Sequence, residues 1–488
     1  MALATEQTLY HLLRRTGFGP SLTEYQRAAA EGFSATLDRL LNDEGISETL
    51  DPTGGLGQSF DPTNLDHLRQ AWLYRMAFSQ KQLREKMTFF WHNHFATSID
   101  TVNDPAFMTR QVDFLRANAL GSFATLLQGI AKDPAMMIML DTRVNSKEAP
   151  NENFAREVME LYTLGEGNGY TEDDVKQAAK TFTGWRFRTQ DDPQGRWKKG
   201  DFYLDSTKQD KTNKVIFGQP LPYSVDQGEK FLDRLLAHPN TGKFLASKLF
   251  RFFIADTPDD ATIAAIADTY YRSGYSIRAM LQTLFTSPAF TSEAAYRSRV
   301  KNPLEFLIGL VKQLGLTSIP FPLIVQSLRA LSLDLFDPPS VKGWPDGPQW
   351  LGTTPLLTRA NQVNTILTAT QNGKPTYFDA VAFCNATGQS TISGLVSELC
   401  RRFVDGDASP ILTNALVGYA LGSPDYQPRI FLPITSKGVD SALTTRGSTE
   451  GPQVSGSAPP PVTTWNGQGV RMRGLLYLLL ASPNYQLN

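Results

Sequence analysis

The chain has 488 residues, of which 41% are apolar and 19% are charged. This composition is sufficient for a sizeable core and excludes an intrinsically disordered chain. The 47 basic and 48 acidic residues leave a net charge of −1. Nucleic-acid binders usually carry a basic excess or a basic stripe, so we expect no nucleic acid as the main ligand.

The N-terminal residues and the length of the apolar runs indicate where in the cell the protein is expected and whether it spans a membrane. The first twenty residues turn amphipathic at once and contain no apolar signal-peptide core, which predicts a cytoplasmic protein or an exported protein numbered without its leader. The late apolar run from Leu475 to Ala481 is far shorter than the roughly 20 residues that a membrane-spanning helix needs, so we expect no membrane span.

Helical periodicity dominates the chain. Apolar residues recur at spacings of three and four in segments 6–15, 21–42, 65–95, 104–131, 152–164, 171–182, 227–253, 258–287, 302–314 and 355–369. Segment 196–218 is compatible with a short hairpin. We predict a mostly α fold, a large multi-helix globular protein with long Gly-, Pro- and Ser-rich loops and at most a small β-hairpin element.

Composition also suggests how this single unit, 1–488, is organised. Segment 433–468 is rich in Ser, Thr, Gly and Pro and is typical of a surface loop. The predicted regions are an N-terminal helical region over 1–135, a polar segment with an irregular insert over 136–225, a helical region with a Trp/Pro-rich loop over 226–432, the surface loop 433–468 and a C-terminal helix over 469–488.

The first candidate for chemistry is a histidine pair, His92 and His94, in the segment 84–95. His-x-His is a common metal-ligand spacing, but two positions apart on a helix the rings lie about 200° apart. Because the segment predicts a helix that ends near Phe95, three readings stay open. They are a two-histidine metal site, a single functional histidine (His94, beyond the helix end) and aromatic packing.

The second candidate is the polar run that begins at Asp141 and continues through the helix predicted over 152–164. On that helix Asn153, Glu157 and Glu160 fall within about 60°, with Arg156 beside them. Two carboxylates one turn apart beside an arginine can supply a general acid and a general base with separated pKa values, or can ligate a cation. The alternative is a solvated face with an internal Arg–Glu pair.

Three aromatic residues are candidates for binding a ligand: Tyr170 in a glycine-rich turn, and Trp185 and Trp344 in loops. Thr171 and Asp174 resemble a capping box, so a second helix is expected to fold back beside the glutamates. Tyr170 and Trp185 could then stack on a sugar ring or another flat ligand, and packing is the alternative. Trp344 lies in a Pro/Gly-rich loop that suits either a binding wall or a rigid plug on the core.

Several signatures are absent from the sequence. It contains no GxSxG, no HExxH, no phosphate-cradling GxxxxGK[ST] and no GxGxxG after a strand. We therefore expect no nucleotide cofactor, whereas a divalent metal stays open. Cys384 and Cys400 form no CxxC motif and leave one disulfide or two buried thiols as alternatives.

The same segments carry a resemblance to a known family. HLLRRTGFGP, REKMTFFWHNHF, NENFAREVMELYTLGEGNGYTEDDV, TFTGW, LFDPPSVKGWP and the closing LLYLLLASPNYQ resemble the bacterial family catalogued as domain of unknown function 1800, from about His11 to Gln486. The resemblance implies a mostly helical, exported protein, periplasmic or secreted, often encoded beside a sulfatase- or phosphatase-like partner. It implies no biochemical role.

One position departs from the family pattern. Members often show His-Asp where this chain has Gln209-Asp210, so a metal site that needs that histidine is placed in doubt here.

The leading functional hypothesis is a hydrolase or lyase that acts on an extracellular polymer, a glycan above all. Glu157 and Glu160 would supply acid–base chemistry and His94 an auxiliary proton donor. Hydrolytic carboxylates need roughly 5–10 Å between them, and one-turn neighbours can lie closer, so Asp141 or Glu152 is the alternative partner. The substrate would be contacted by five further residues: Asn153, Arg156, Tyr170, Trp185 and Trp344.

Two other hypotheses belong to different classes. The first is a metal-binding enzyme that uses His92 or His94 with a carboxylate of 157–160. The second is a non-enzymatic envelope scaffold, or a partner of the co-encoded sulfatase-like protein, in which the polar run is a buried network that fixes helix packing.

Overall fold

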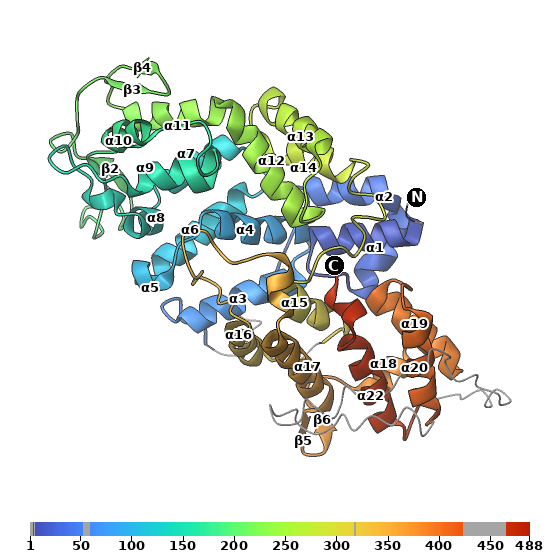
Figure 1. The fold of residues 1–488 in the computed structure, drawn as a ribbon. Coiled ribbons are helices and arrows are strands. Elements are labelled where there is room, and N and C mark those ends of the chain that lie inside the picture. The colour runs from blue at the N-terminus through green and yellow to red at the C-terminus, as the bar shows by residue number, and fades with distance from the viewer. Residues whose placement is uncertain (1–2, 4, 52–58, 317–318, 423–464) are drawn as a thin grey trace. The chain divides into compact units, whose positions relative to one another are not determined.

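The computed structural model describes residue 3 and residues 5–51, 59–316, 319–422 and 465–488. These residues form two compact units (Figure 1). The first unit comprises 35–295 and 333–345, and the second comprises 3–34, 296–332 and 346–488. Both are built from helices with small two-stranded antiparallel sheets, which confirms the predicted mostly α fold. Most of the predicted surface loop, 433–464, lies outside the described residues.

The first unit holds the segments that carry the candidate chemistry. Its elements are α3 (Leu65–Phe78), α4 (Gln82–His94), α5 (Ile99–Val102), α6 (Pro105–Asn118), α7 (Phe123–Ala131), α8 (Pro134–Met139), η2 (Thr142–Val144), α9 (Asn153–Glu157), η3 (Val158–Thr163), α10 (Glu172–Thr181), β1 (Trp185–Phe187), β2 (Phe202–Leu204), β3 (Lys214–Ile216), β4 (Gln219–Leu221), α11 (Gln227–Ala237), α12 (Pro239–Phe253), α13 (Asp260–Arg272) and α14 (Ile277–Phe285). β1 pairs with β2 and β3 with β4.

The second unit contains both ends of the described chain. Its elements are α1 (Thr5–Thr16), α15 (Pro303–Gln313), α16 (Phe321–Ala330), η4 (Gly347–Leu351), α17 (Thr353–Thr368), β5 (Thr370–Gln371), β6 (Lys374–Pro375), α18 (Ala380–Asn385), α19 (Ile392–Val404), α20 (Pro410–Leu421), α22 (Gly469–Leu480) and η6 (Pro483–Gln486). α2 (Leu22–Leu41) passes from this unit to the first one beyond a kink at Gly32.

Several predicted helices are interrupted where local chemistry overrides periodicity. Segment 227–253 is split into α11 and α12 because Pro239 disfavours helical backbone at His238, which is extended. Segment 65–95 is split at Ser79, also extended, which ends α3 before α4 begins. Because the spacing of apolar residues continues across both breaks, a prediction from this spacing joins the two helices of each segment into one.

Helix α4 forms the core of the first unit. Met87, Phe90 and Trp91 are buried, and its polar residues Glu85 and Lys86 are buried with them. A helix that is covered on every side is typical of the middle of a large core. The surrounding elements are therefore arranged around α4.

The loop 333–345 closes over the C-terminal end of α4. The Oδ1 atom of Asn93 accepts a hydrogen bond from the backbone N–H of Trp344 at 2.6 Å. Gly343 is in the left-handed region with φ +85°, and a Cβ atom there would overlap the Asn93 side-chain oxygen. Only glycine allows this approach, so the loop is held down against the helix.

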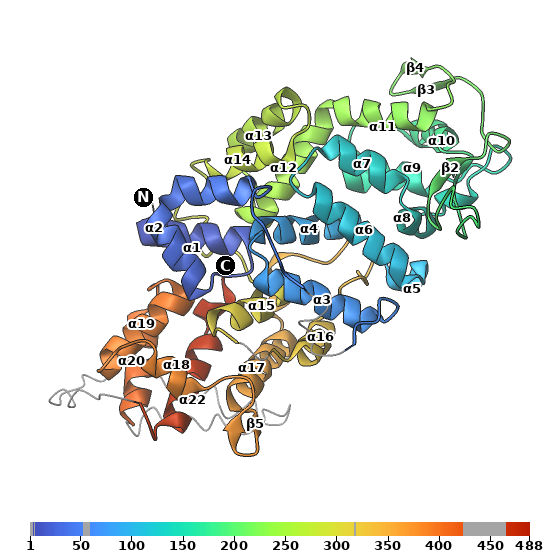
Figure 2. The ribbon, with the colours of Figure 1, turned by 180° about the vertical axis from the view of Figure 1, so that it is seen from behind.

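In the second unit, α22 packs against α17, α18, α19 and α20. The residues after α22 lie beside α1 in both views (Figures 1 and 2). Backbone hydrogen bonds fix them to the segment before α15, from Lys301 N–H to Gln486 O at 2.8 Å and from Asn488 N–H to Arg299 O at 2.7 Å. The first and last family segments therefore meet in one unit.

The buried ion pair between Arg84 and Asp43 stabilises the packing of the first unit, and a substitution at Arg84 tests this role. Asp43 is 1% exposed and is held by both Nε and Nη2 of Arg84, and Arg84 also donates to the carbonyls of Arg116 and Ala117. We expect Arg84→Met to lower the free energy of unfolding by about 3–5 kcal/mol, because it leaves the buried Asp43 carboxylate unpaired. Urea denaturation measures this loss.

The matched control is Lys230→Met, which removes a half-exposed pair with Asp226 in the same unit. Exposed pairs contribute little, so this variant should unfold like the wild type. Equal losses in the two variants would contradict the assigned role of the Arg84–Asp43 pair.

Candidate functional site

The predicted catalytic helix is not a regular α-helix. α9 continues directly into the π-helix η3, in which Leu164 N–H donates to Met159 O at 2.8 Å. The Thr163 hydroxyl also donates to Val158 O, five residues back, at 2.6 Å. π-turns are rare and occur frequently at functional sites. The junction falls between Glu157 and Glu160, so the angular relation expected from a 3.6-residue period does not hold across it.

Arg156 is the centre of an ion-pair network. It binds Glu172 through two parallel hydrogen bonds of 2.9 and 2.8 Å, Glu152 at 3.1 Å and Glu160 at 3.4 Å. Glu172 and Glu160 raise the pKa of Arg156, and Arg156 in turn lowers the pKa of Glu172. The guanidinium is therefore engaged by protein carboxylates, which is the predicted internal Arg–Glu pair extended to three glutamates.

Glu157 lies beside this network without belonging to it. It is half-buried, and within the described part of the chain it makes no hydrogen bond or ion pair. Burial is the main cause that raises its pKa, and the Glu160 charge raises it further, while Arg156 and Lys342 oppose the shift. A carboxyl group that is partly desolvated, unpaired and next to a second carboxylate is a candidate acid–base group.

Two residues beside Glu157 are absent from the predicted site. Glu166, in the turn after η3, and Lys342, in the loop 333–345, form an ion pair at 3.4 Å, and both charges act on Glu157. Lys342 is 185 positions away from Glu157 in the sequence, so periodicity gives no signal for it. The structure therefore brings the loop segment to the polar helix through a lysine and not through a tryptophan.

Tyr170, Asn153 and Asp141 occupy different places around the network. The Tyr170 hydroxyl accepts a hydrogen bond from Gly167 N–H at 2.9 Å and hydrogen-bonds to Glu160. Asn153 is exposed at the start of α9, where Asn151 accepts its N–H. Asp141 begins η2 with φ +57° and shows no bond to the glutamates among the described residues.

Both candidate histidines lie in the core. The His92 ring is surrounded by Trp72, Phe336 and Trp344 at centroid distances of 5.4, 5.7 and 5.5 Å, and burial lowers its pKa to about 3. His94 is the last residue of α4, and its Nε2 lies 3.2 Å from the Tyr162 carbonyl oxygen.

These positions favour the aromatic-packing alternative for the histidines. Burial holds the pKa of His94 well below its usual value. A neutral buried imidazole is a poor proton donor, so this position of His94 does not favour its role as the auxiliary acid. Among the described residues no group of three or more His, Cys, Asp or Glu side chains is arranged to hold a metal ion.

The two tryptophans assigned to substrate binding are also core residues. Trp185 is 1% exposed, with Phe182 and Phe202 at centroid distances of 5.0 and 5.1 Å. Trp344 is 4% exposed and stacks on Phe89 at 5.8 Å. Neither ring offers an open face, because each is used to anchor its own segment. These positions favour packing for Trp185 and a plug on the core for Trp344 over a role of either ring in binding substrate.

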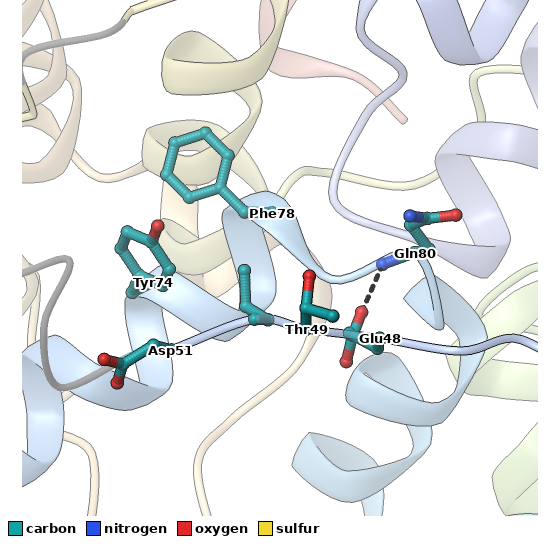
Figure 3. A pocket seen from close by; sticks show the side chains of 7 residues that line it. Glu48, Thr49, Asp51, Tyr74, Phe78 and Gln80 are labelled. Atoms are coloured by element: carbon teal, nitrogen blue, oxygen red, sulfur yellow. Dashed lines mark hydrogen bonds between the residues drawn. The ribbon is translucent and has the colours of Figure 1, made fainter.

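A shallow pocket of about 400 Å³ lies elsewhere on the first unit, at the end of α3 (Figure 3). Tyr74 and Phe78, one turn apart, stand beside the extended segment 48–51, and their ring centroids are 4.8 Å apart. Glu48 accepts the Gln80 N–H at 2.7 Å. The pocket contains none of the predicted site residues.

Gln209 is buried, and both the amide nitrogen and the amide oxygen of its side chain are hydrogen-bonded. It donates to Val225 O and accepts from the Tyr223 hydroxyl, both at 3.1 Å. The position is structural in this protein.

Cys384 and Cys400 are free buried thiols, so the alternative of two buried thiols holds and that of a disulfide does not. No helix in the described ranges is long and apolar enough to cross a membrane.

The network makes a prediction for the pKa of Glu157. Glu160→Gln should lower it, because a like charge is removed, and Arg156→Met should raise it, because the favourable cation is lost. NMR titration of the glutamate carboxyl carbons measures both shifts. The control Asp173→Asn removes an exposed carboxylate of α10 and should leave Glu157 unchanged; shifts of equal sign in the first two variants would refute the scheme.

Metal analysis tests the placement of His94. We expect the same metal content in the wild type and in His94→Ala, since the ring is enclosed by aromatic neighbours and bonded to a carbonyl oxygen. Elemental analysis of both proteins after gel filtration checks this. Stoichiometric metal that is present in the wild type and lost in the variant would return His94 to a ligand role.

No curated protein and no solved structure matches the chain. A family model described as "Protein of unknown function (DUF1800)" matches residues 11–487, essentially the whole chain, as the resemblance predicted. The protein therefore belongs to the DUF1800 family.

Proposed function

We propose that the surface around Glu157 is the catalytic site of a hydrolase or lyase that acts on an extracellular polymer, a glycan above all. The observation that carries this proposal is the environment of Glu157: half-buried, unpaired among the described residues, and raised in pKa beside a second carboxylate. A carboxyl group whose pKa is raised is better suited than an ordinary one to hold and donate a proton, and polymer hydrolysis and elimination both require proton transfer.

Glu157 and Glu160 are distinguished by their partners. Arg156 and Tyr170 both bind the Glu160 side chain. Glu157, which lacks such bonds, is the group that exchanges a proton with the substrate. Two carboxylates whose environments differ in this way can divide the roles of acid and charge stabiliser between them.

Arg156 takes a different role from the predicted one. Its hydrogen bonds to Glu152, Glu160 and Glu172 leave it as a positioning residue that holds the carboxylates, and it does not bind substrate itself. Asn153, exposed on the same helix, remains the proposed substrate contact. An exported location, periplasmic or secreted, follows from the family resemblance alone and forms part of the proposal.

A scaffold function is the second candidate, and a specific observation favours it. One arginine binding three glutamates is a way to fix α9 against α10, and the buried tryptophans fix the adjoining segments. On this hypothesis the protein positions another exported protein, such as the sulfatase-like protein encoded beside relatives. Recovery of one stoichiometric partner, with no turnover of any polymer, would support it.

Turnover of glycans tests the catalytic proposal. A panel of bacterial and plant polysaccharides is screened for new reducing ends or unsaturated ends. We expect Glu157→Gln to lose roughly 10²–10⁴-fold in rate, because it removes the proton donor. Asp173→Asn, a change of an exposed carboxylate of α10 that does not act on Glu157, is the matched control and should keep most of the activity.

The pH profile gives a second test of the same role. If Glu157 acts as the acid, the rate falls as pH rises through its raised pKa, and Glu160→Gln moves this limb to lower pH. Full activity in Glu157→Gln on the substrate found in the screen would end the catalytic proposal.

A further inference from the structure

The pocket at the end of α3 has one aromatic side, which Tyr74 and Phe78 form (Figure 3). The two residues are one helical turn apart, so their side chains leave α3 on the same face. Tyr74 is half-buried and Phe78 is 40% exposed, and their ring centroids lie 4.8 Å apart. Part of this ring surface is therefore open to a ligand.

The other side of the pocket is polar and is formed by the segment 48–51 and Gln80. Glu48 accepts the backbone N–H of Gln80 at 2.7 Å, which fixes the segment to the turn between α3 and α4. Rings on one side and a few polar groups on the other, around a volume of about 400 Å³, are typical of sites for small ligands. The residues that line the pocket are Glu48, Thr49, Leu50, Asp51, Tyr74, Phe78 and Gln80.

The charge of the pocket limits the class of ligand. Glu48 and Asp51 contribute carboxylates, and no lysine or arginine is among the described residues that line it. Arg75 and Lys81 are next to lining residues in the sequence but do not line the pocket themselves. A concave surface with charge of one sign attracts the opposite charge. The pocket therefore disfavours anions and suits a neutral or cationic ligand.

The contacts of Glu48 favour a cation over a neutral ligand. Glu48 is half-buried, its hydrogen bond is to a neutral backbone N–H, and it makes no ion pair within the described ranges. A hydrogen bond between two charged groups is roughly twice as strong as one between neutral groups. An ammonium group in the pocket would supply this carboxylate with its counter-charge.

The ring surface of the pocket favours the same class of ligand. The face of an aromatic ring attracts cations, and this attraction is the usual way in which proteins bind quaternary ammonium groups. Elsewhere in this unit the protein's own cations occupy ring faces, as Arg188 does at 4.0 Å from the centre of the Tyr203 ring. No cation of the described chain lies over Phe78, so its face is left for a ligand.

We propose that this pocket binds an organic cation, whose ammonium group contacts the Glu48 carboxylate and the rings of Tyr74 and Phe78. Thr49 and Gln80 provide polar groups for the rest of the ligand. Two sources supply this chemistry: a small quaternary amine, and an amino-sugar unit of a glycan. The proposal does not rest on the catalytic one, because the pocket contains neither Glu157 nor a residue of the Arg156 network.

Calorimetric titration of the full-length protein with choline tests the quaternary amine. The reference ligand is 3,3-dimethylbutan-1-ol, a neutral alcohol of nearly the same shape in which carbon replaces the charged nitrogen. We expect choline to bind at least about tenfold more tightly than the alcohol, and more weakly as ionic strength rises. Equal affinities for choline and the alcohol would overturn the proposal, because the charge would then contribute nothing.

Two substitutions assign the binding to the pocket. Glu48→Gln removes the charge and keeps a side-chain oxygen that can accept the Gln80 N–H, and we expect affinity about tenfold weaker. Phe78→Leu keeps an apolar side chain and removes the ring face, and we expect affinity roughly two- to fivefold weaker. Melting temperatures confirm that both variants are folded. Unchanged affinity in both variants would refute this site.

The matched control is Asp173→Asn, which removes an exposed carboxylate of the same unit outside the pocket. It changes the net charge as Glu48→Gln does, and it should keep the wild-type affinity. An equal loss in the two variants would show a general effect of charge and contradict the site. Glu157→Gln should also bind the cation like the wild type, so this proposal and the catalytic one can fail separately.

A second pair of ligands distinguishes the two sources of the cation. A glucosamine oligomer is compared with an N-acetylglucosamine oligomer of the same length and linkage, at a pH at which the amino groups are protonated. Binding of the glucosamine oligomer that is lost on acetylation assigns an amino-sugar site, and binding of choline alone assigns a site for small quaternary amines. Binding of neither cation refutes the proposal.

Discussion

Burial of α4 on every side is the constraint on which the rest of the first unit depends. Because α4 is buried on nearly every side although it carries polar residues such as Glu85 and Lys86, other elements must both cover it and provide partners for those residues. The loop 333–345 does so through the Asn93–Trp344 hydrogen bond, and η3 does so through Tyr162, whose carbonyl lies against His94. The same packing that encloses His92 and His94 brings the backbone of Glu157 and Lys342 to the edge of the core.

This constraint explains which site residues the sequence could predict. Asn153, Arg156, Glu157 and Glu160 are predictable because a helix groups residues three and four positions apart. The Arg–Glu pair is predictable for the same reason, and the capping box at Thr171 and Asp174 is formed as expected. Most helices likewise follow from apolar spacing, and their missed breaks lie at caps and prolines that spacing does not register.

The remaining features depend on tertiary structure. Lys342 acts on Glu157 from another segment, and the π-helix arises where a regular period would be assumed. The tryptophans, in contrast, were predicted as part of the site although the structure buries them. A tryptophan in a Gly/Pro-rich loop suits a binding wall and a plug equally well, and only burial separates the two. Trp185 and Trp344 are buried, whereas the half-buried Tyr74 and the exposed Phe78 line a pocket that the sequence does not predict.

Some buried charged side chains have a counter-charge of their own, and others do not. Pairs of the first kind are structural, whereas groups of the second kind are candidates for function. Arg84 with Asp43 and Lys312 with Glu24 are complete pairs, and nothing more is needed to account for their burial. Glu157 lacks a cation of its own, and Arg14 with Arg297 share one carboxylate. A buried charged group without its own counter-charge lowers the stability of the folded protein. Such a group is retained more readily where it has a functional role that offsets this cost.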